Sequence, residues 1–209
     1  MRRVGGSFRD PSGYVFDDGV KIMRTVNEQY KPVWEYAEAC GLFLGLNEAE
    51  LLVPFESADI PRDMSGKVWK CVEPERIPFI SYPYEWSFSQ LKDAALLTLD
   101  VLREALARGM TLKDASAYNV QFKGAHPLFI DLLSFDIYKE GDIWQGYRQF
   151  CMHFLAPLAL MKYNIGLGGL SRQWIDGVPL SLASSLLPRR SQLSLGLQMH
   201  VHTHARAEQ

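Results

Sequence analysis

Cysteine is scarce in this sequence. The three cysteines, Cys40, Cys71 and Cys151, lie far apart and form no C-x-x-C pair. Structural zinc sites and disulfide frameworks need clustered or regularly spaced cysteines, so neither is expected. A reduced, cytoplasmic location is the simplest interpretation.

Long apolar runs and an export signal are also lacking. The longest apolar stretch, FLAPLALM at 154–161, is far shorter than the roughly 18 residues that cross a bilayer. The opening MRRVGGSFRD carries two arginines but no apolar segment behind them. We therefore expect no membrane segment and no membrane partner.

A charge excess of either sign is missing as well. Lysine and arginine number 22, aspartate and glutamate number 24, and the formal net charge is -2. Such a balance gives no general attraction to nucleic acid, so no nucleic-acid partner is expected. What is abundant is apolar surface: 47% of the 209 residues are hydrophobic and 12% are aromatic. This is enough for one large domain or two small lobes.

The first 85 residues mix short strands with one helical region, and we expect a strand-rich lobe over 1–85. Gly19 follows Asp18 between two β-prone runs, which predicts a hairpin across 13–26. Two later runs, VWKCV and IPFISY, predict two further strands that follow a polar loop.

Helical texture lies between the hairpin and that loop. Pro32 suits the first turn of a helix, and Gly41 or Gly45 suits its end. One or two helices are therefore expected over 27–52.

From Ser87 the sequence pattern becomes mainly helical, and we expect a helical lobe over 86–209. Apolar side chains recur at steps of three and four, at Leu91, Ala95, Leu99, Leu102, Leu106 and Met110. Ser87 and Gln90 have the spacing of a capping box, and Gly109 suits a C-terminal stop. A long helix is thus predicted over 87–109. Two short apolar runs after it, YNVQF and PLFIDLLSF, predict a small hairpin beside this helix.

Three polar residues after the long helix form the most informative pattern. Asp114 and Asn119 stand in TLKDASAYNVQF, and Asp131 follows within an apolar run that predicts a strand. Phosphoryl transfer needs a carboxylate to orient or deprotonate the attacking hydroxyl, and oxygen ligands to hold Mg²⁺ against the phosphates. The spacing predicts that Asp114 is a catalytic base and that Asn119 and Asp131 are metal ligands.

The D-x-x-x-x-N pattern followed by a second aspartate resembles the catalytic loop of protein kinases and of kinases similar to aminoglycoside phosphotransferases. The resemblance implies an α+β, two-lobed protein-kinase-like fold, with a small strand-containing N-lobe and a mostly helical C-lobe. In that fold the catalytic-loop-like segment would be 111–136. ATP and Mg²⁺ are the cofactors that it implies.

Other parts follow in the order of the same fold. Arg24 in VKIMRTV would be the phosphate cation, and Lys70 is the alternative. The helix after Arg24 would offer it a carboxylate, from among Glu28, Glu35 and Glu38. FISYPYEW would be the hinge between lobes, with Ser81 and Tyr82 contacting the adenine base.

Departures from the kinase pattern favour a second interpretation. Leu112 and Lys113 replace the His and Arg of H-R-D, and Leu132 and Leu133 replace the Phe and Gly of D-F-G. No G-x-G-x-x-G motif opens the chain. An inactive, pseudokinase-like module is therefore the alternative to a phosphotransferase.

Longer stretches are similar to a bacterial family labelled class I SAM-dependent methyltransferases of the nodulation-protein type. They are FRDPSGYVF, PFISYPYEWSFSQLKDAALLTLDVL, LKDASAYNVQF, PLFIDLLSFD and YRQFCMHFLAPLALM. The similarity is to the N-terminal portion of that family, which implies a kinase-like module and, as a partner, a methyltransferase domain beyond it. Within this chain NIGLGGLSRQWID is a poor match to a SAM-binding glycine turn, so SAM is not expected to bind.

The C-terminal segment carries three histidines at alternate positions. As a strand, LSLGLQMHVHTH would place His200, His202 and His204 on one face. Such an array suits a transition metal, although a solvated face is the commoner case.

Overall fold

A computed structural model describes residues 2–3, 11–17, 19–61, 67–163 and 172–207. The chain is a mixed α and β structure. The glycine turn at 164–171, considered above for SAM binding, lies outside the described residues. Within the described part, no helix combines the length and apolarity that a membrane crossing requires.

One antiparallel sheet occupies the N-terminal part of the chain. Its order is β1-β2-β3-β5-β4. The strands are β1 (Arg2–Arg3), β2 (Val15–Asp17), β3 (Ile22–Asn27), β4 (Phe55–Ala58) and β5 (Val68–Pro74). The predicted hairpin is confirmed, because β2 pairs with β3 in a register that puts Val15 opposite Arg24.

Two sequence predictions in this region are wrong. IPFISY forms no strand, because Pro78 removes a backbone donor and the main chain of Ser81 bonds to a side chain instead. Conversely, β4 lies partly in what was predicted to be a polar loop. It is an edge strand whose central residues, Glu56 and Ser57, are exposed, so its sequence lacks a strong apolar signal.

Two helices follow β3, within the span predicted for one or two. After a short turn, η2 (Glu28–Tyr30), they are α1 (Lys31–Ala39) and α2 (Leu42–Glu48). Pro32 lies in the first turn of α1, as expected. Gly41 separates the helices with a φ of 73°, a left-handed conformation that glycine adopts without steric cost.

The predicted long helix is α3 (Phe88–Leu106), which follows the short turn η4 (Pro83–Glu85). The capping box is confirmed: the Gln90 amide donates to Ser87 Oγ at 3.3 Å, and the Ser87 amide donates to Gln90 Oε1 at 3.0 Å. The predicted apolar stripe is partly wrong, because Leu99 and Leu106 are exposed. The buried face runs instead through Ala94, Thr98, Val101 and Ala105, whose small side chains allow β6 and β8 to pack closely.

Two small antiparallel pairs lie beside α3. They are β6 (Met110–Leu112) with β9 (Phe135–Ile137), and β7 (Val120–Lys123) with β8 (His126–Phe129). The β7–β8 pair is the small hairpin expected from the sequence. The turn η5 (Ala117–Asn119) precedes it. Asp131 was expected on a strand, but it lies in the loop just after β8.

The rest of the described chain is mainly helical. One continuous helical run contains α4 (Tyr147–Phe150), the short π-helix η6 (Cys151–Leu155) and α5 (Ala156–Tyr163). The later elements are α6 (Leu180–Leu186), η8 (Arg189–Leu193), α7 (Leu195–Leu197), the short π-helix η9 (Gln198–His202) and α8 (Thr203–Ala207). The strand considered for the histidine segment is therefore wrong. Its alternating apolar residues lie on helical turns, where alternate side chains face different directions.

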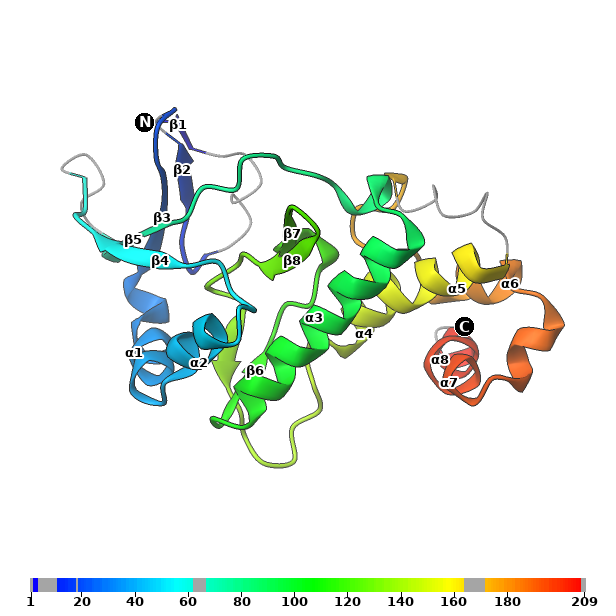
Figure 1. Cartoon of the computed structure of the whole chain (residues 1–209). Helices are drawn as coiled ribbons and strands as arrows, with labels where there is room; N and C mark the ends of the chain where they lie inside the picture. The colour runs from blue at the N-terminus through cyan, green and yellow to red at the C-terminus, as the bar shows by residue number, and fades with distance from the viewer. Residues whose placement is uncertain (1, 4–10, 18, 62–66, 164–171, 208–209) are drawn as a thin grey trace.

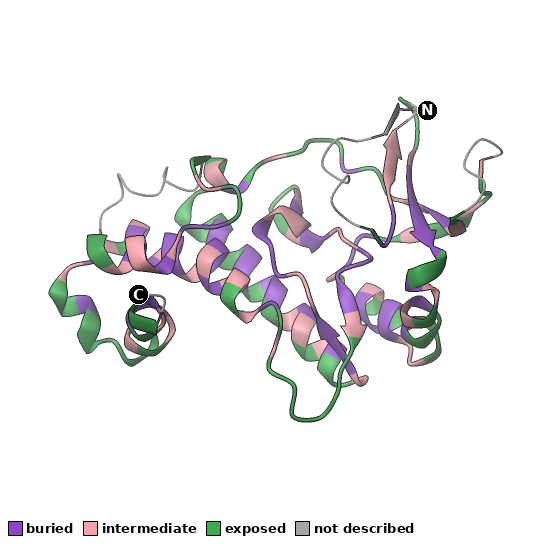
Figure 2. Cartoon of the chain, turned by 180° about the vertical axis from the view of Figure 1, so that it is seen from behind, coloured by how far each residue is buried: buried purple, intermediate pink, exposed green. Residues whose placement is uncertain are grey.

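The buried side chains form two clusters. The larger one joins the sheet, α1, α2 and α3. It extends past residue 85, where the boundary between the two lobes was expected, and includes Phe154 in η6. The smaller one lies among the C-terminal helices. Figure 1 shows α3 between the sheet and the C-terminal helices, which lie at opposite ends of the molecule. Buried and exposed residues alternate along the helices, as expected when one face packs inward (Figure 2).

Acid should destabilise the helical part through His153. This side chain is 7% exposed. Burial lowers its pKa from 6.5 to about 4, although Asp176 opposes part of that effect. The folded state disfavours the protonated His153 ring. The stability that the neutral ring contributes is therefore fully present above about pH 6.5 and is lost as the pH falls toward 4. We expect the free energy of unfolding to fall by about 3 kcal/mol across that window.

Urea unfolding at a series of pH values measures this effect. The difference between wild type and His153→Leu isolates it, because titratable groups that do not interact with His153 contribute equally to both proteins. His126→Leu changes an exposed histidine and serves as the matched control. Parallel stability–pH curves for wild type and His153→Leu would contradict the prediction.

Candidate functional site

Arg24 and Asp131 meet although 107 residues separate them in the chain. Arg24 lies on β3, opposite Val72 of β5, and its side chain is 9% exposed. The guanidinium Nη2 donates to Asp131 Oδ1 at 2.9 Å. This ion pair joins the N-terminal sheet to the loop after β8.

Asp131 receives hydrogen bonds on both carboxylate oxygens. Besides the Arg24 contact, Oδ1 accepts the Leu133 amide at 3.3 Å, and Oδ2 accepts the Ser134 hydroxyl at 2.7 Å. The carboxylate is 22% exposed, so it remains accessible from solvent. These contacts fix its orientation and leave lone pairs for a further ligand.

Ser134 connects Asp131 to Asn119. The Asn119 side-chain nitrogen donates to Ser134 Oγ at 3.1 Å and lies 3.4 Å from the main-chain oxygen of Asp114. The nitrogen of the amide is thereby assigned to protein partners, which leaves its oxygen as the group that can bind a cation. The sequence did not single out Ser134, and a hydroxyl three residues after an aspartate is its only signal.

Asp114 lies at the start of the loop between β6 and β7, which also contains Asn119. Its Oδ1 accepts the Ser116 amide at 3.0 Å, in a turn that aspartate commonly stabilises. Main-chain bonds from Lys113 and Asp114 to the Ser134 oxygen, at 2.8 and 3.4 Å, place this loop beside the Asp131 loop.

The pKa of Asp114 is raised above its ordinary value. Burial is the main cause, and the negative charge of Asp131 adds to it. Hydrogen bonds from Ser116, Gln149 and Asn119 act in the opposite direction. A raised pKa brings a carboxylate closer to the range in which it works as a general base. Gln149, which also accepts the Ala115 amide at 2.7 Å, had no signal in the sequence.

Two of the three carboxylates expected beside Arg24, those of Glu35 and Glu38, pair with other cations. Glu35 lies 3.9 Å from Lys31, and Glu38 forms an ion pair with Lys70. Lys70, the alternative phosphate cation, also lies over the Trp34 ring at 5.3 Å. Of the two candidate cations, Arg24 is therefore the one that the structure brings to Asp131.

The segment expected to contact adenine is bonded within the protein. Gln121 on β7 is buried, and its amide pairs with the main chain of Ser81: Ser81 N donates to Gln121 Oε1 at 3.0 Å, and Gln121 Nε2 donates to Ser81 O at 2.9 Å. The Tyr82 amide donates to Glu85 at 2.8 Å, and its ring stacks on Tyr84 with centroids 5.4 Å apart. A base that bound the main-chain N–H of Ser81 would have to displace Gln121.

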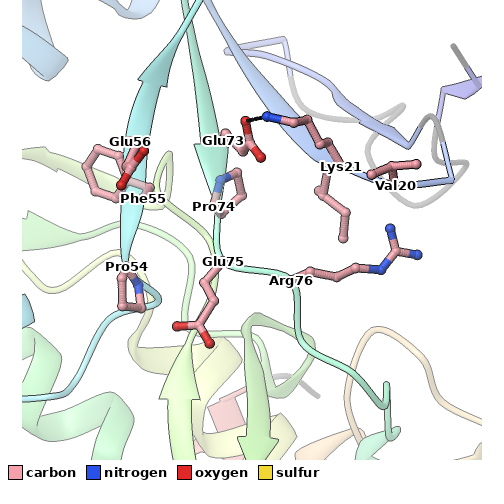
Figure 3. Close-up of a pocket in the computed structure, with 10 residues that line it drawn as sticks. Val20, Lys21, Pro54, Phe55, Glu56, Glu73, Pro74, Glu75 and Arg76 are labelled. Atoms are coloured by element: carbon pink, nitrogen blue, oxygen red, sulfur yellow. Dashed lines mark hydrogen bonds and ion pairs between the residues drawn. The ribbon is translucent and has the colours of Figure 1, made fainter.

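A pocket of about 480 Å³ lies at the ends of β3, β4 and β5. Its lining includes an ion pair between Lys21 and Glu73, 2.6 Å apart, and the side chains of Glu56, Glu75 and Arg76 (Figure 3). No residue of the predicted phosphate site lines this pocket. Its mixed charges identify no ligand.

We expect Ser134→Ala to destabilise the protein by about 1–3 kcal/mol. The buried hydroxyl donates to Asp131 and accepts from Asn119, so its removal leaves both groups under-satisfied. Urea unfolding measures the change. Ser185→Ala is the control, because that hydroxyl is exposed and bonds only locally, to Leu182 O. Equal stability of the two variants would show that Ser134 does not organise this site.

Comparison with known proteins gives one informative match. No family model matches the chain. The chain is 40% identical over 202 residues to the nodulation protein NoeA of Rhizobium meliloti (strain 1021). The match includes 95% of this chain but only 42% of that relative's length. The chain is therefore similar to less than half of a longer nodulation protein.

Proposed function

We propose that the chain is a kinase-like, nucleotide-binding module in which Arg24, Asn119 and Asp131 form a magnesium–phosphate site. One observation carries the proposal. Arg24 contacts Asp131 across 107 residues, and Ser134 bonds both Asp131 and Asn119. Asn119 and Asp131, chosen from spacing, and Arg24, chosen through the kinase resemblance, thus belong to one hydrogen-bonded group.

The order of the elements supports the two-lobed, kinase-like part of the proposal. An antiparallel sheet with a helix pair comes first, and an extended linker then leads to α3. The loop with Asp114 and Asn119 follows, then the β7–β8 hairpin, then Asp131. Protein kinases carry their phosphate-binding cation, catalytic loop and metal-binding aspartate in this order along the chain.

The residues present fit Mg²⁺ bound together with a nucleotide. Among the described residues no three His, Cys, Asp or Glu side chains form a metal cluster. Mg²⁺ does not need such a cluster, because it is usually bound by one or two carboxylates, water and substrate phosphates. Asp131 and the Asn119 oxygen would be its protein ligands, and the ion would neutralise phosphate charge.

Arg24 and Asp114 would act on the substrates. The Arg24 guanidinium can bind phosphate oxygens with two parallel hydrogen bonds, which a lysine at this position could not do. Asp114 would accept the proton of an acceptor hydroxyl, and its raised pKa favours that role. We place this activity in the cytoplasm, where ATP and Mg²⁺ are available.

A second candidate is an inactive module that positions or regulates a methyltransferase domain. Two observations favour it. Gln121 bonds the main chain of Ser81 where a base was expected, and the matched relative extends far beyond the region that this chain resembles. Asp131 would then be a structural partner of Arg24.

Thermal-shift measurements with ATP, GTP and SAM, each with and without Mg²⁺, test nucleotide binding first. Mg²⁺-dependent stabilisation by a nucleotide supports the proposal, and no response to any nucleotide at millimolar concentration would refute it. Phosphate transfer or release that disappears in Asp114→Ala, while nucleotide binding persists, supports the enzyme. Nucleotide-independent binding to a separately produced methyltransferase domain supports the positioning module.

A further inference from the structure

Two histidines in the C-terminal helices lie one helical turn apart. His200 is in η9 and His204 is in α8, so the sequence HVHTH has the i, i+4 spacing that puts both rings on one side of a helix. The same spacing presents two histidines to zinc in other helical sites. Neither residue takes part in the site around Asp131.

Both rings converge on the hydroxyl of Tyr147 in α4. Tyr147 Oη lies 2.5 Å from His200 Nδ1 and 3.1 Å from His204 Nε2. Ligand atoms about 2.0–2.1 Å from a tetrahedral zinc ion lie roughly 3.3 Å from one another. Both distances from Tyr147 Oη are shorter than this separation, so the side chains would have to move outward by less than about 1 Å to admit an ion.

His202 does not belong to this group. Its Nδ1 lies 2.8 Å from Ser184 Oγ and its Nε2 lies 2.9 Å from Ser191 Oγ. The ring is buried and both nitrogens are satisfied. The structure thus divides the three histidines into one packed residue and one pair.

The surroundings suit an ion that enters from solvent. Tyr147, His200 and His204 are all partly exposed, so an ion can reach them without unfolding. Cys151 lies one turn after Tyr147 on the same helical run, is buried, and interacts with the Tyr147 hydroxyl. A soft sulfur donor therefore lies beside the nitrogen and oxygen donors.

We propose that His200 Nδ1, His204 Nε2 and the Tyr147 hydroxyl bind one transition-metal ion of the class that imidazole prefers, such as Zn²⁺, Co²⁺ or Cu²⁺. Water would complete the coordination. The described residues contain no cluster of three His, Cys, Asp or Glu side chains, so the proposal takes its third protein ligand from Tyr147, which would bind as the phenolate and release its proton to solvent. The ion would fasten the C-terminal helix to α4. This site is independent of the proposed nucleotide function.

Calorimetric titration of the untagged full chain with Zn²⁺ tests the proposal, and Co²⁺ absorption reports the geometry. We expect one saturable equivalent and a higher melting temperature with metal. His200→Ala and His204→Ala should each weaken binding by about tenfold or more, since even indirect support of a metal ligand contributes that much. Tyr147→Phe keeps the ring in place and should also weaken binding.

His126→Ala is the matched control, because His126 is exposed on β8 and distant in sequence from the pair. It should bind Zn²⁺ as wild type does. Circular dichroism of each variant verifies folding. Absence of saturable binding to wild type, or unchanged affinity in His200→Ala and His204→Ala, would overturn the proposal. Unchanged affinity in Tyr147→Phe would overturn the three-ligand assignment.

Discussion

Asp131→Asn is expected to abolish the Mg²⁺ dependence of nucleotide binding. The change removes the negative charge of the proposed metal ligand while it keeps the size of the side chain. Wild type should bind ATP more tightly with Mg²⁺ than without it, and the variant should lose at least about a tenfold enhancement, on the order of 1.4 kcal/mol. Calorimetric titrations with and without Mg²⁺ measure both affinities.

Asp142→Asn is the control for this change. It removes the same charge from an exposed loop and should leave the Mg²⁺ effect intact. Asp131→Asn also weakens the contact with Arg24, which is 2.9 Å in wild type, so the stability of each variant has to be measured in parallel. An unchanged Mg²⁺ dependence in a folded variant would mean that Asp131 is not a metal ligand.

Trp34→Ala is expected to give a loss of stability of about 3–5 kcal/mol. Trp34 is fully buried in α1 and packs against Phe43 and Phe55, with ring centroids 4.7 and 5.7 Å away. Phe43 in turn packs against Phe135 at 6.4 Å. Removal of the indole would open a cavity among α1, α2 and β4.

Trp34→Phe keeps an aromatic ring at this position and measures the effect of a smaller loss of packing. The indole nitrogen has no hydrogen-bond partner among the described residues, so the smaller ring loses no hydrogen bond. We expect this variant to lose less stability than Trp34→Ala. Urea unfolding measures both. A Trp34→Ala protein within about 1 kcal/mol of wild type would contradict the cavity argument.

The elements that the sequence predicted depend on local signals. The capping box at Ser87 and the β2–β3 hairpin both join residues that are close in the sequence, and both are present. The missed elements depend on distant partners. β4 has a weak apolar pattern and is held by pairing with β5, while the segment at Ser81 is held by Gln121, 40 residues later.

The segment with the C-terminal histidines was predicted incorrectly from its residue pattern. Alternation of apolar and polar residues predicts a strand, yet the segment is helical. The buried residues Leu197, Val201 and Ala205 recur at steps of four, and the first two pack in the smaller core. This helical period was present in the sequence but was less visible than the alternation.

The candidate site was predictable only in part. The spacing of Asp114, Asn119 and Asp131 suggested a shared purpose, and Arg24 was chosen through the kinase resemblance. Ser134, which bonds both Asn119 and Asp131, was not chosen, because an isolated serine has no distinctive pattern. Its importance depends on distances that only a folded chain defines.

A crystal structure of the protein with Mg²⁺ and a non-hydrolysable ATP analogue would test the central claim most directly. We predict a metal ion about 2.0–2.1 Å from an Asp131 oxygen and the Asn119 side-chain oxygen. Arg24 should contact a phosphate, and Gln121 should have released Ser81 if the base binds there. An analogue bound elsewhere, such as in the pocket beside Lys21 and Glu73, would contradict the claim. So would a metal ion that touches neither Asn119 nor Asp131.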